Sequence, residues 1–316
     1  MMSLPEILQI GSYPDWDQNP LDAAFVMHRY FAAEDQNGFL AKHGKTVRAI
    51  ATRGDLGANR AIIEACSKLE IISVYGVGYD GVDLVAAKER GIRVTNTPDV
   101  LTQDVADLAV AMMLCQSRGT IGAERWVRDG SWSSKGMYPL QRKVWGKKAG
   151  VLGLGRIGFE VAKRLTGFGM DIAYCSRTEK ENASQWRYIS NPAELARHSD
   201  FLFVALAASP ATRHIVNHEV IDAVGPDGMI INISRASNID ELALLEALES
   251  KKLGFAALDV FEGEPRLNPR FLALDNVLLQ PHHASGTFET RKAMGQLLRD
   301  NLTAHFAGQP LLTPVL

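Results

Sequence analysis

Three residues with useful chemistry, Arg235, Glu264 and His282, each lie a few positions beyond an apolar run that is typical of a buried β-strand. The three runs are Met229–Ile233, Phe255–Leu258 and Val277–Leu279. Open parallel sheets place their sites beyond the carboxyl ends of strands, so these side chains are candidates for one site. Each alone has an ordinary alternative: a neighbour of a helix N-cap, a solvated loop acid, or a loop histidine with satisfied hydrogen bonds.

The chemistry that fits this combination is the reduction of a carbonyl group. A carboxylate favours the charged form of a nearby imidazole, so His282 beside Glu264 could act as an acid near neutral pH. The guanidinium of Arg235 could hold a carboxylate with two hydrogen bonds and polarise the neighbouring carbonyl. Such a set needs a cofactor that supplies hydride.

A glycine-rich turn indicates where that cofactor would bind. Ala149–Leu152 reads as a short strand that runs into a G-x-G-x-x-G turn and an amphipathic helix; the turn consists of Gly153, Leu154, Gly155, Arg156, Ile157 and Gly158. Gly153 permits the tight turn, Gly155 lets a pyrophosphate approach, and Gly158 lets the helix pack closely. A glycine turn without a ligand is the alternative. Because a second strand follows at Asp171–Cys175, the pattern favours a dinucleotide site.

The end of that second strand predicts which dinucleotide is preferred. Sites for NAD usually carry an acid there, which accepts hydrogen bonds from the ribose hydroxyls. This chain has Ser176, Arg177 and Thr178 instead, and the first acid is Glu179. A guanidinium between two hydroxyls suits a ribose phosphate, so we expect NADP(H). An arginine on a solvated loop is the alternative.

Composition bounds the class of protein. A length of 316 residues predicts two domains, and 46% hydrophobic with 22% charged residues is typical of a globular protein. A net charge of -2 argues against nucleic acid or an anionic membrane as a partner. The three scattered cysteines fit a reducing compartment, no signal peptide is recognisable, and the longest apolar run, Phe201–Ala208, is too short to cross a bilayer. We therefore expect a cytoplasmic protein.

The first hundred residues alternate between strand and helix patterns, which predicts a small α/β layer structure with a parallel sheet. Strands are expected at Ile7–Ile10, Val47–Ala51, Ile71–Tyr75 and Ile92–Thr95, and helices near Asp22–Ala32, Asn59–Ser67 and Val82–Glu89. Residues 76–81 form a second G-x-G-x-x-G. No acid or arginine cluster ends the next strand, where Asn96 and Thr97 stand, so we do not interpret it as the dinucleotide site. Its amides could still hold a small anion.

The remaining segments predict a second, larger layer structure. A long apolar helix at Asp99–Arg118 suggests a domain seam or a subunit interface. Gly130–Leu140 reads as a loop that exposes large aromatics, either an arm on another subunit or a plug within the chain. Further strands are expected at Phe201–Ala205 and at the three runs named above, with helices near Pro192–His198, His218–Val224 and Ile239–Glu249. A closing helix, Thr290–Phe306, has no strand after it and should cross back to the first domain.

Over essentially its whole length the chain resembles the D-isomer-specific 2-hydroxyacid dehydrogenases. The resemblance is carried by residues 76–80, the helix containing Thr102–Leu108, the G-L-G-R-I-G turn, residues 232–235, residues 259–265 and Pro281-His282. It implies an α/β fold with two doubly wound parallel-sheet domains and the active site in the cleft. The expected domains are a flavodoxin-like substrate domain of residues 1–98 and 286–316 and a Rossmann cofactor domain of residues 99–285.

The resemblance also implies roles for individual residues. His282 would be the acid/base, Glu264 its partner and Arg235 the group that binds the 2-oxo acid. Asp259 would contact the nicotinamide side. Further cofactor contacts are expected from Thr102 and Ile233, and further substrate contacts from the amides of Val77 and Gly78, which would hold the carboxylate, and from Arg53 and Gly54.

Within the family, the glyoxylate and hydroxypyruvate reductases are most similar to this chain at residues 138–140, 175–177 and 282–287. They imply the reduction of a small 2-oxo acid. With the expectation drawn from residues 176–178, we predict that NADPH is the cofactor, with NAD(H) as a possible second one. The apolar helix and the aromatic arm predict a homodimer. One alternative is an NAD(H)-dependent enzyme for a larger 2-oxo acid such as hydroxyphenylpyruvate, and another is a nucleotide-sensing binding protein of the same fold. Ala236 departs from the glycine common in the family, and Ser176 from the acid of NAD enzymes.

No metal is expected. His214 and His218 are four residues apart, as zinc ligands on a helix can be, but the sequence offers no third ligand.

Overall fold

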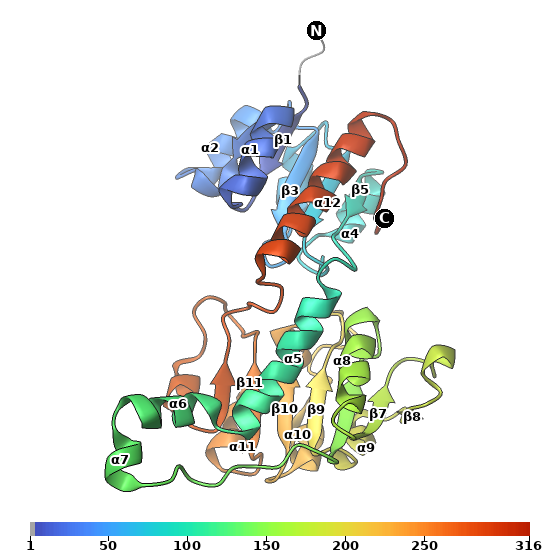
Figure 1. Cartoon of the computed structure of the whole chain (residues 1–316). Coiled ribbons are helices and arrows are strands. Elements are labelled where there is room, and N and C mark those ends of the chain that lie inside the picture. The colour runs from blue at the N-terminus through green and yellow to red at the C-terminus, as the bar shows by residue number, and fades with distance from the viewer. Residues whose placement is uncertain (1–3) are drawn as a thin grey trace. The chain divides into compact units, whose positions relative to one another are not determined.

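The computed structural model describes residues 4–316 and separates them into two compact units. The first unit holds the chain up to Leu101 together with Ser285–Leu316, and the second holds Thr102–Ala284. Each is a parallel sheet with helices on both faces (Figure 1). The predicted α/β class is therefore confirmed.

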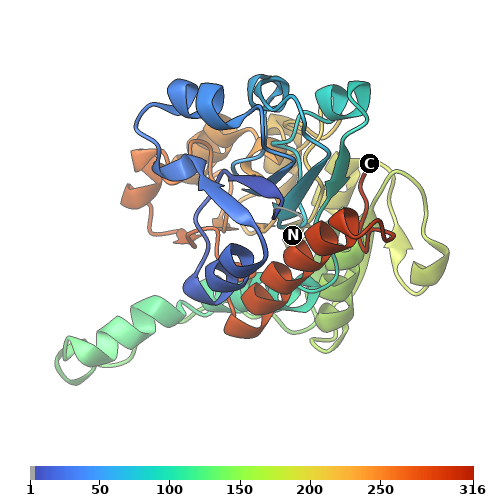
Figure 2. The same ribbon diagram turned by 90° about the horizontal axis from the view of Figure 1, so that it is seen from above.

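The first unit has a five-stranded sheet in the order β2-β1-β3-β4-β5, which is the flavodoxin-like order. The central strands β3 and β4 are almost completely buried, because helices cover both of their faces. Seen from above, α12 lies on one face of this sheet (Figure 2), and Ser73 donates to the carbonyl of Leu298 there. The strands are β1 (Glu6–Gln9), β2 (Val26–Arg29), β3 (Ala49–Arg53), β4 (Ile71–Tyr75) and β5 (Arg93–Thr95); the helices are α1 (Asp15–Ala24), α2 (Gln36–His43), α3 (Arg60–Ala65), α4 (Leu84–Glu89) and α12 (Phe288–Phe306), with a 3-10 turn, η1, at Tyr30–Ala32.

The helix predicted at Asp22–Ala32 is wrong. Helix α1 already ends at Ala24, and Val26–Arg29 forms the edge strand β2, paired in parallel with β1. None of the four residues of β2 is fully buried, so its sequence lacks the apolar run that revealed the other strands. Helix α2 was missed for a related reason, since none of its side chains is buried either.

The second unit has a seven-stranded parallel sheet in the order β12-β11-β10-β9-β6-β7-β8. This is the Rossmann order with one additional strand at the β12 edge. The two-residue strand β8 was not predicted. The strands are β6 (Lys148–Leu152), β7 (Asp171–Cys175), β8 (Arg187–Tyr188), β9 (Phe201–Val204), β10 (Met229–Asn232), β11 (Phe255–Leu258) and β12 (Val277–Leu279); the helices are α5 (Thr102–Ser117), α6 (Thr120–Arg128), α7 (Ser131–Lys135), α8 (Arg156–Thr166), α9 (Pro192–Arg197), α10 (His218–Val224) and α11 (Glu241–Glu249), with 3-10 turns at Glu181–Ala183, Ala236–Asn238 and Pro269–Ala273.

Helix α5 begins at Thr102, three residues later than predicted, because Asp99 has a left-handed backbone with φ of 68°. Its apolar side chains, among them Val105, Ala109 and Met113, are buried, and the helix packs along α8 and over β10 to β12 (Figure 1). Much of its apolar surface therefore belongs to the core of the second unit.

Residues 120–140 form a helical arm that contains α6 and α7. The predicted loop Gly130–Leu140 is therefore helical at Ser131–Lys135, while residues 136–140 have no helical structure. Helices α6 and α7 stand away from the other helices of their unit (Figure 2), and α6 buries none of its side chains. The arm exposes Val127, Trp132, Met137 and Leu140. The prediction of exposed large aromatics is correct for Trp132, whereas Tyr138 is half-buried and packs against Trp126.

The last residues complete the first unit. Beyond α12, the amide of Val315 donates to the carbonyl of Val94, at the edge of β5, over 2.7 Å. In residues 4–316 no helix combines the length and apolar character needed to cross a membrane.

Candidate active site

The glycine turn lies at the carboxyl end of the central strand β6. The amide of Gly153 donates to the carbonyl of Cys175 over 2.8 Å, which ties the turn to the end of β7. Gly153 has a φ of 101°, a backbone that other residues rarely adopt. Helix α8 then starts at Arg156 with Gly155 as its N-cap, and no side chain caps its first amides. These amides are donors for an anion.

The space around the turn fits a pyrophosphate. A Cβ atom at Gly155 would meet nothing within 4 Å, so the backbone there is open to a ligand. A Cβ atom at Gly158 would lie 2.0 Å from the carbonyl oxygen of Gly153, so only glycine lets the helix approach this closely. Both observations are what a dinucleotide site of this kind requires.

The end of β7 presents an exposed guanidinium. Arg177 and Thr178 are exposed, and Arg177 forms no ion pair within residues 4–316. The hydroxyl of Ser176 donates to the carbonyl of Thr178 over 2.6 Å, and this hydrogen bond closes the turn. Since a hydroxyl has one proton to donate, Ser176 shapes the turn here and Arg177 remains the principal donor for a phosphate.

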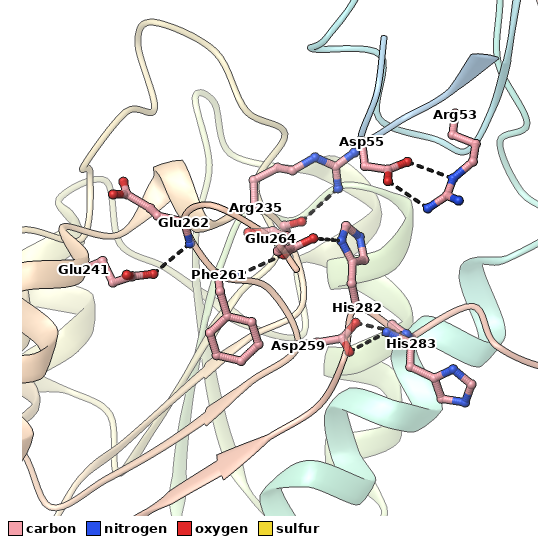
Figure 3. Close-up of polar contacts among 12 residues, drawn as sticks. Arg53, Asp55, Arg235, Glu241, Asp259, Phe261, Glu262, Glu264, His282 and His283 are labelled. Carbon is pink, nitrogen blue, oxygen red and sulfur yellow. Dashed lines mark hydrogen bonds and ion pairs between the residues drawn. The ribbon is translucent and has the colours of Figure 1, made fainter. Parts of the chain in front are cut away.

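His282 and Glu264 form a close pair, drawn in Figure 3. The Nδ1 atom of His282 lies 2.6 Å from Oε2 of Glu264, and Oε1 of the same carboxylate accepts the amide of Phe261 over 2.8 Å. Burial raises the pKa of Glu264, but the hydrogen bonds from His282 and Phe261, with the charges of His282 and Arg235, outweigh it and hold the pKa below the ordinary value. The carboxylate is thus ionised and fixed in orientation.

The turn that carries His282 is held by Asp259. His282 has a left-handed backbone with φ of 51°, a conformation that costs about 1–3 kcal/mol and persists only where neighbouring groups enforce it. The carboxylate of Asp259 accepts the amides of His283 and Ala284 over 2.6 and 2.9 Å (Figure 3). Its side chain is buried, and burial raises its pKa while the two amides oppose that effect. Both oxygens are therefore engaged within the protein, and a nicotinamide contact for Asp259 stays a prediction.

Arg235 is positioned by buried amide side chains. The side-chain oxygen of Asn232 accepts the amide and hydroxyl of Ser234, and its nitrogen donates to the carbonyl of Arg235 over 3.1 Å. Asn238 donates to the hydroxyl of Ser234 over 3.0 Å. Figure 3 shows Arg235, Glu264 and His282 gathered on the loops that follow β10, β11 and β12. The structure thus brings together the three residues predicted to be catalytic.

The other predicted cofactor contacts are less accessible. The side chain of Ile233 is buried beyond β10, and Thr102 is buried at the first position of α5. Both lie in the second unit with the glycine turn, and their contacts with a cofactor stay predictions. Residues 4–316 contain no cluster of three or more possible metal ligands; His218 opens α10, and His214 lies 3.8 Å from Glu262.

The predicted substrate residues of the first unit lie at the carboxyl ends of β3 and β4. Arg53 pairs with Asp55 through two hydrogen bonds of 3.1 and 2.7 Å (Figure 3), a partner that the sequence did not reveal. Gly54 follows on the same turn and is partly exposed. The amides of Val77 and Gly78 donate to no group within residues 4–316, which leaves them available for an anion.

These features together define a dinucleotide-dependent oxidoreductase. They are a Rossmann sheet with an open glycine turn, an imidazole–carboxylate pair, and an arginine beyond neighbouring strand ends. The family model for the D-isomer specific 2-hydroxyacid dehydrogenase, NAD binding domain, matches residues 110–284. The chain belongs to this family, in its glyoxylate and hydroxypyruvate reductase subgroup.

Three relatives illustrate the match. Hydroxyphenylpyruvate reductase of Plectranthus scutellarioides is 47% identical over 94% of this chain and 95% of its own. The structure of a 2-hydroxyacid dehydrogenase from Ketogulonicigenium vulgare Y25 is 69% identical with a TM-score of 0.94, over 100% of this chain and 99% of that one. An NADPH-dependent glyoxylate/hydroxypyruvate reductase from Sinorhizobium meliloti, solved with NADP and malonate, is 39% identical with a TM-score of 0.91, over 99% and 97%. The chain is therefore an oxidoreductase for 2-oxo acids that uses a nicotinamide dinucleotide.

Proposed function

We propose that the protein uses NADPH to reduce a small 2-oxo acid, glyoxylate or hydroxypyruvate, to the 2-hydroxy acid. The observation that carries the reaction is the 2.6 Å contact between His282 and Glu264 with Arg235 nearby in the same unit. The observation that favours NADPH is the exposed Arg177 at the end of β7, where no acid stands. The Sinorhizobium relative, which is named as NADPH-dependent, supports this preference.

The residues of the second unit can carry out the proton transfer. Because Nδ1 of His282 faces Glu264, the other ring nitrogen, Nε2, is the atom that would donate a proton to the substrate oxygen. The charge of Glu264 stabilises the protonated imidazole before this step, and Arg235 would hold the substrate carboxylate. When bound, the nicotinamide supplies the hydride that the carbonyl carbon receives.

In the first unit, we propose that the amides of Val77 and Gly78 also bind the substrate carboxylate. Two neighbouring amides that donate to no group in the described part of the chain, residues 4–316, are a suitable anion site. Arg53 is the weaker candidate of this set, because its guanidinium already donates two hydrogen bonds to Asp55.

Purified protein with NADPH, followed at the near-ultraviolet absorbance of the reduced cofactor, tests the proposal. We expect glyoxylate and hydroxypyruvate to be reduced with higher kcat/KM than pyruvate, and His282→Ala to lower kcat by roughly 10²–10⁴-fold. Wild-type protein that reduces none of these acids with either cofactor would refute the proposed function.

A second candidate substrate is hydroxyphenylpyruvate, favoured by the 47% identity to the Plectranthus enzyme. The two candidates differ in the size of the group attached to the 2-oxo acid. A kcat/KM for hydroxyphenylpyruvate above that for hydroxypyruvate would favour this second candidate and leave the chemistry of His282 unchanged.

We also propose that the protein is a homodimer formed through the helical arm of residues 120–140. The arm exposes Trp132 (63%), Met137 (83%) and Leu140 (95%), and such apolar surface is typical of an interface. Light scattering should give twice the monomer mass for the wild type, and a Trp132→Glu, Met137→Glu variant should be monomeric. A monomeric wild type at micromolar concentration would contradict the proposal.

A further inference from the structure

The turn that follows β4 is held by hydrogen bonds with the two residues that follow β5. The carbonyl of Gly76 accepts the amide of Thr97 over 2.9 Å, and the carbonyl of Val77 accepts the side-chain nitrogen of Asn96 over 2.9 Å. The amide of Gly76 donates to the hydroxyl of Thr97 over 3.0 Å. Gly76 itself has a φ of 149°, so the turn needs glycine for its backbone. All these bonds lie within the first unit.

These contacts, together with the geometry of the peptide bond, fix the direction in which the amides of Val77 and Gly78 point. In a planar trans peptide the carbonyl and the N–H point in opposite directions. The peptide that contains the carbonyl of Gly76 also contains the N–H of Val77, and the carbonyl of Val77 belongs with the N–H of Gly78. Because Thr97 and Asn96 hold the two carbonyls, both amides must point to the opposite side of the turn.

Asn96 is well placed to keep this orientation. It follows β5 directly, and its side chain is largely buried, with 8% of the residue exposed. Its own backbone is fixed as well, since its carbonyl accepts the hydroxyl of Thr313 over 2.6 Å. A buried amide with a fixed backbone has few alternative rotamers, so the bond to Val77 should persist.

We propose that Asn96 is a positioning residue for substrate specificity. By holding the carbonyl of Val77, it directs the amide of Gly78 toward the carboxylate of the 2-oxo acid. This inference rests on the proposed function, in which the amides of Val77 and Gly78 bind that carboxylate. Without Asn96, the peptide between Val77 and Gly78 is free to rotate, and the carboxylate loses one donor.

The test compares a 2-oxo acid with its neutral amide, for example pyruvate with pyruvamide, in wild type, Asn96→Ala and Asn96→Asp. A hydrogen bond to a charged group is stronger than one to a neutral group, so losing it penalises the acid more than the amide. In both variants we expect KM for the acid to rise roughly 10- to 100-fold, with kcat and KM for NADPH changed less than about threefold. Discrimination between acid and amide should fall by a similar factor.

Asn96→Asp guards against a folding defect in Asn96→Ala, because it keeps the shape of the side chain while an oxygen replaces the donor nitrogen. It also adds a negative charge, so Asn96→Ala is the variant that removes the donor alone. Asn276→Ala is the matched control: the side chain of Asn276 also donates to backbone carbonyls, those of Leu248 and Gly254, but in the second unit. It should lower Tm without altering the discrimination. If Asn96→Asp folds and keeps the wild-type ratio of acid to amide, the role of Asn96 is refuted, whereas a wild type inactive on every 2-oxo acid refutes the proposed function instead.

Discussion

One carboxylate, that of Glu264, is shared between the amide of Phe261 and the imidazole of His282, at 2.8 and 2.6 Å. The bond to Phe261 is made within the loop that carries Glu264, so the loop itself orients the carboxylate. The second oxygen is thereby directed at Nδ1 of His282. In this arrangement Nε2 is the ring nitrogen of His282 left for a substrate, and the charge of the imidazole helps to hold the pKa of Glu264 low.

The first prediction follows from the charge of Glu264. Glu264→Gln keeps an oxygen that can accept a hydrogen bond but removes the negative charge that stabilises the protonated imidazole. Reduction, which needs that proton, should therefore fail at lower pH than in the wild type. We therefore expect the alkaline limb of the kcat profile to lie at lower pH in this variant than in the wild type. The limb is measured between pH 6 and 10 with saturating NADPH, and an unshifted limb would remove Glu264 from the mechanism.

The same variant should also change how the stability of the folded protein depends on pH. Because folding lowers the pKa of Glu264 below its ordinary value of 4.5, its ionised carboxylate stabilises the folded protein above that pH. The contribution is lost as the pH falls from 4.5 through the lowered pKa. The Tm of Glu264→Gln should consequently fall less steeply than that of the wild type in this acid range, as thermal unfolding monitored by circular dichroism can measure.

Asp259 gives the second prediction. Its two oxygens accept the amides of His283 and Ala284, and Asn at this position would turn an NH2 group toward one of these donors. The left-handed backbone of His282 would lose part of its support. We expect Asp259→Asn to lower kcat for the 2-oxo acid by roughly 10-fold or more, because a displaced imidazole donates its proton poorly.

The control for this effect is cofactor binding, measured by quenching of tryptophan fluorescence. A change in kcat with unchanged Kd for NADPH would assign Asp259 to the His282 turn. A large loss of NADPH affinity with unchanged kcat would instead support the direct cofactor contact that the family resemblance implies.

Much of the fold could be predicted from sequence because its signals are local. Buried strands such as Phe201–Val204 are continuous apolar runs, and the turn from Gly153 to Gly158 needs its residue types at fixed spacing. The edge strands β2 and β8 escaped prediction because exposure on one side removes that run.

The site was predictable only in part, for a similar reason. Arg235, Glu264 and His282 stand out as functional residue types placed beyond recognisable strands. Asn96 and Asp259 make their contacts with backbone groups 19 and 24 or more residues away, and such partners depend on how the strands assemble. The family resemblance marks Asp259 as a nicotinamide contact but does not indicate its bonds to the His282 turn. For Asn96, its place directly after a strand is the one signal in the sequence.

The third prediction concerns Arg235. Lysine keeps the charge but loses the planar fork that holds a carboxylate with two bonds. Arg235→Lys should lower kcat/KM for the 2-oxo acid by roughly 100-fold. This is the effect of losing about two charge-assisted hydrogen bonds, of which the ammonium group of lysine replaces a part. The neutral amide of the same substrate should lose much less. Equal losses for the acid and the amide would place Arg235 outside carboxylate recognition.

The last prediction is the cofactor preference, which depends on the exposed turn at the end of β7. NADPH and NADH differ only in one ribose phosphate, far from the transferred hydride, so any preference must come from binding that phosphate. A hydrogen bond to a charged group contributes about 1.5–3 kcal/mol. One bond from Arg177 would give wild type a preference for NADPH on the order of 10–10² in kcat/KM.

Replacing the turn should reverse this preference. Ser176→Asp with Arg177→Ala supplies an acceptor for the ribose hydroxyls and repels the phosphate. We expect KM for NADPH to rise and KM for NADH to fall while kcat changes little, because the residues at the reacting centre are untouched. Arg197→Ala, which removes an exposed arginine from α9 in the same unit, is the matched control and should leave the preference unchanged. Equal wild-type efficiency with NADPH and NADH would make Arg177 an ordinary solvated arginine, and the cofactor would then have to be recognised by the glycine turn alone.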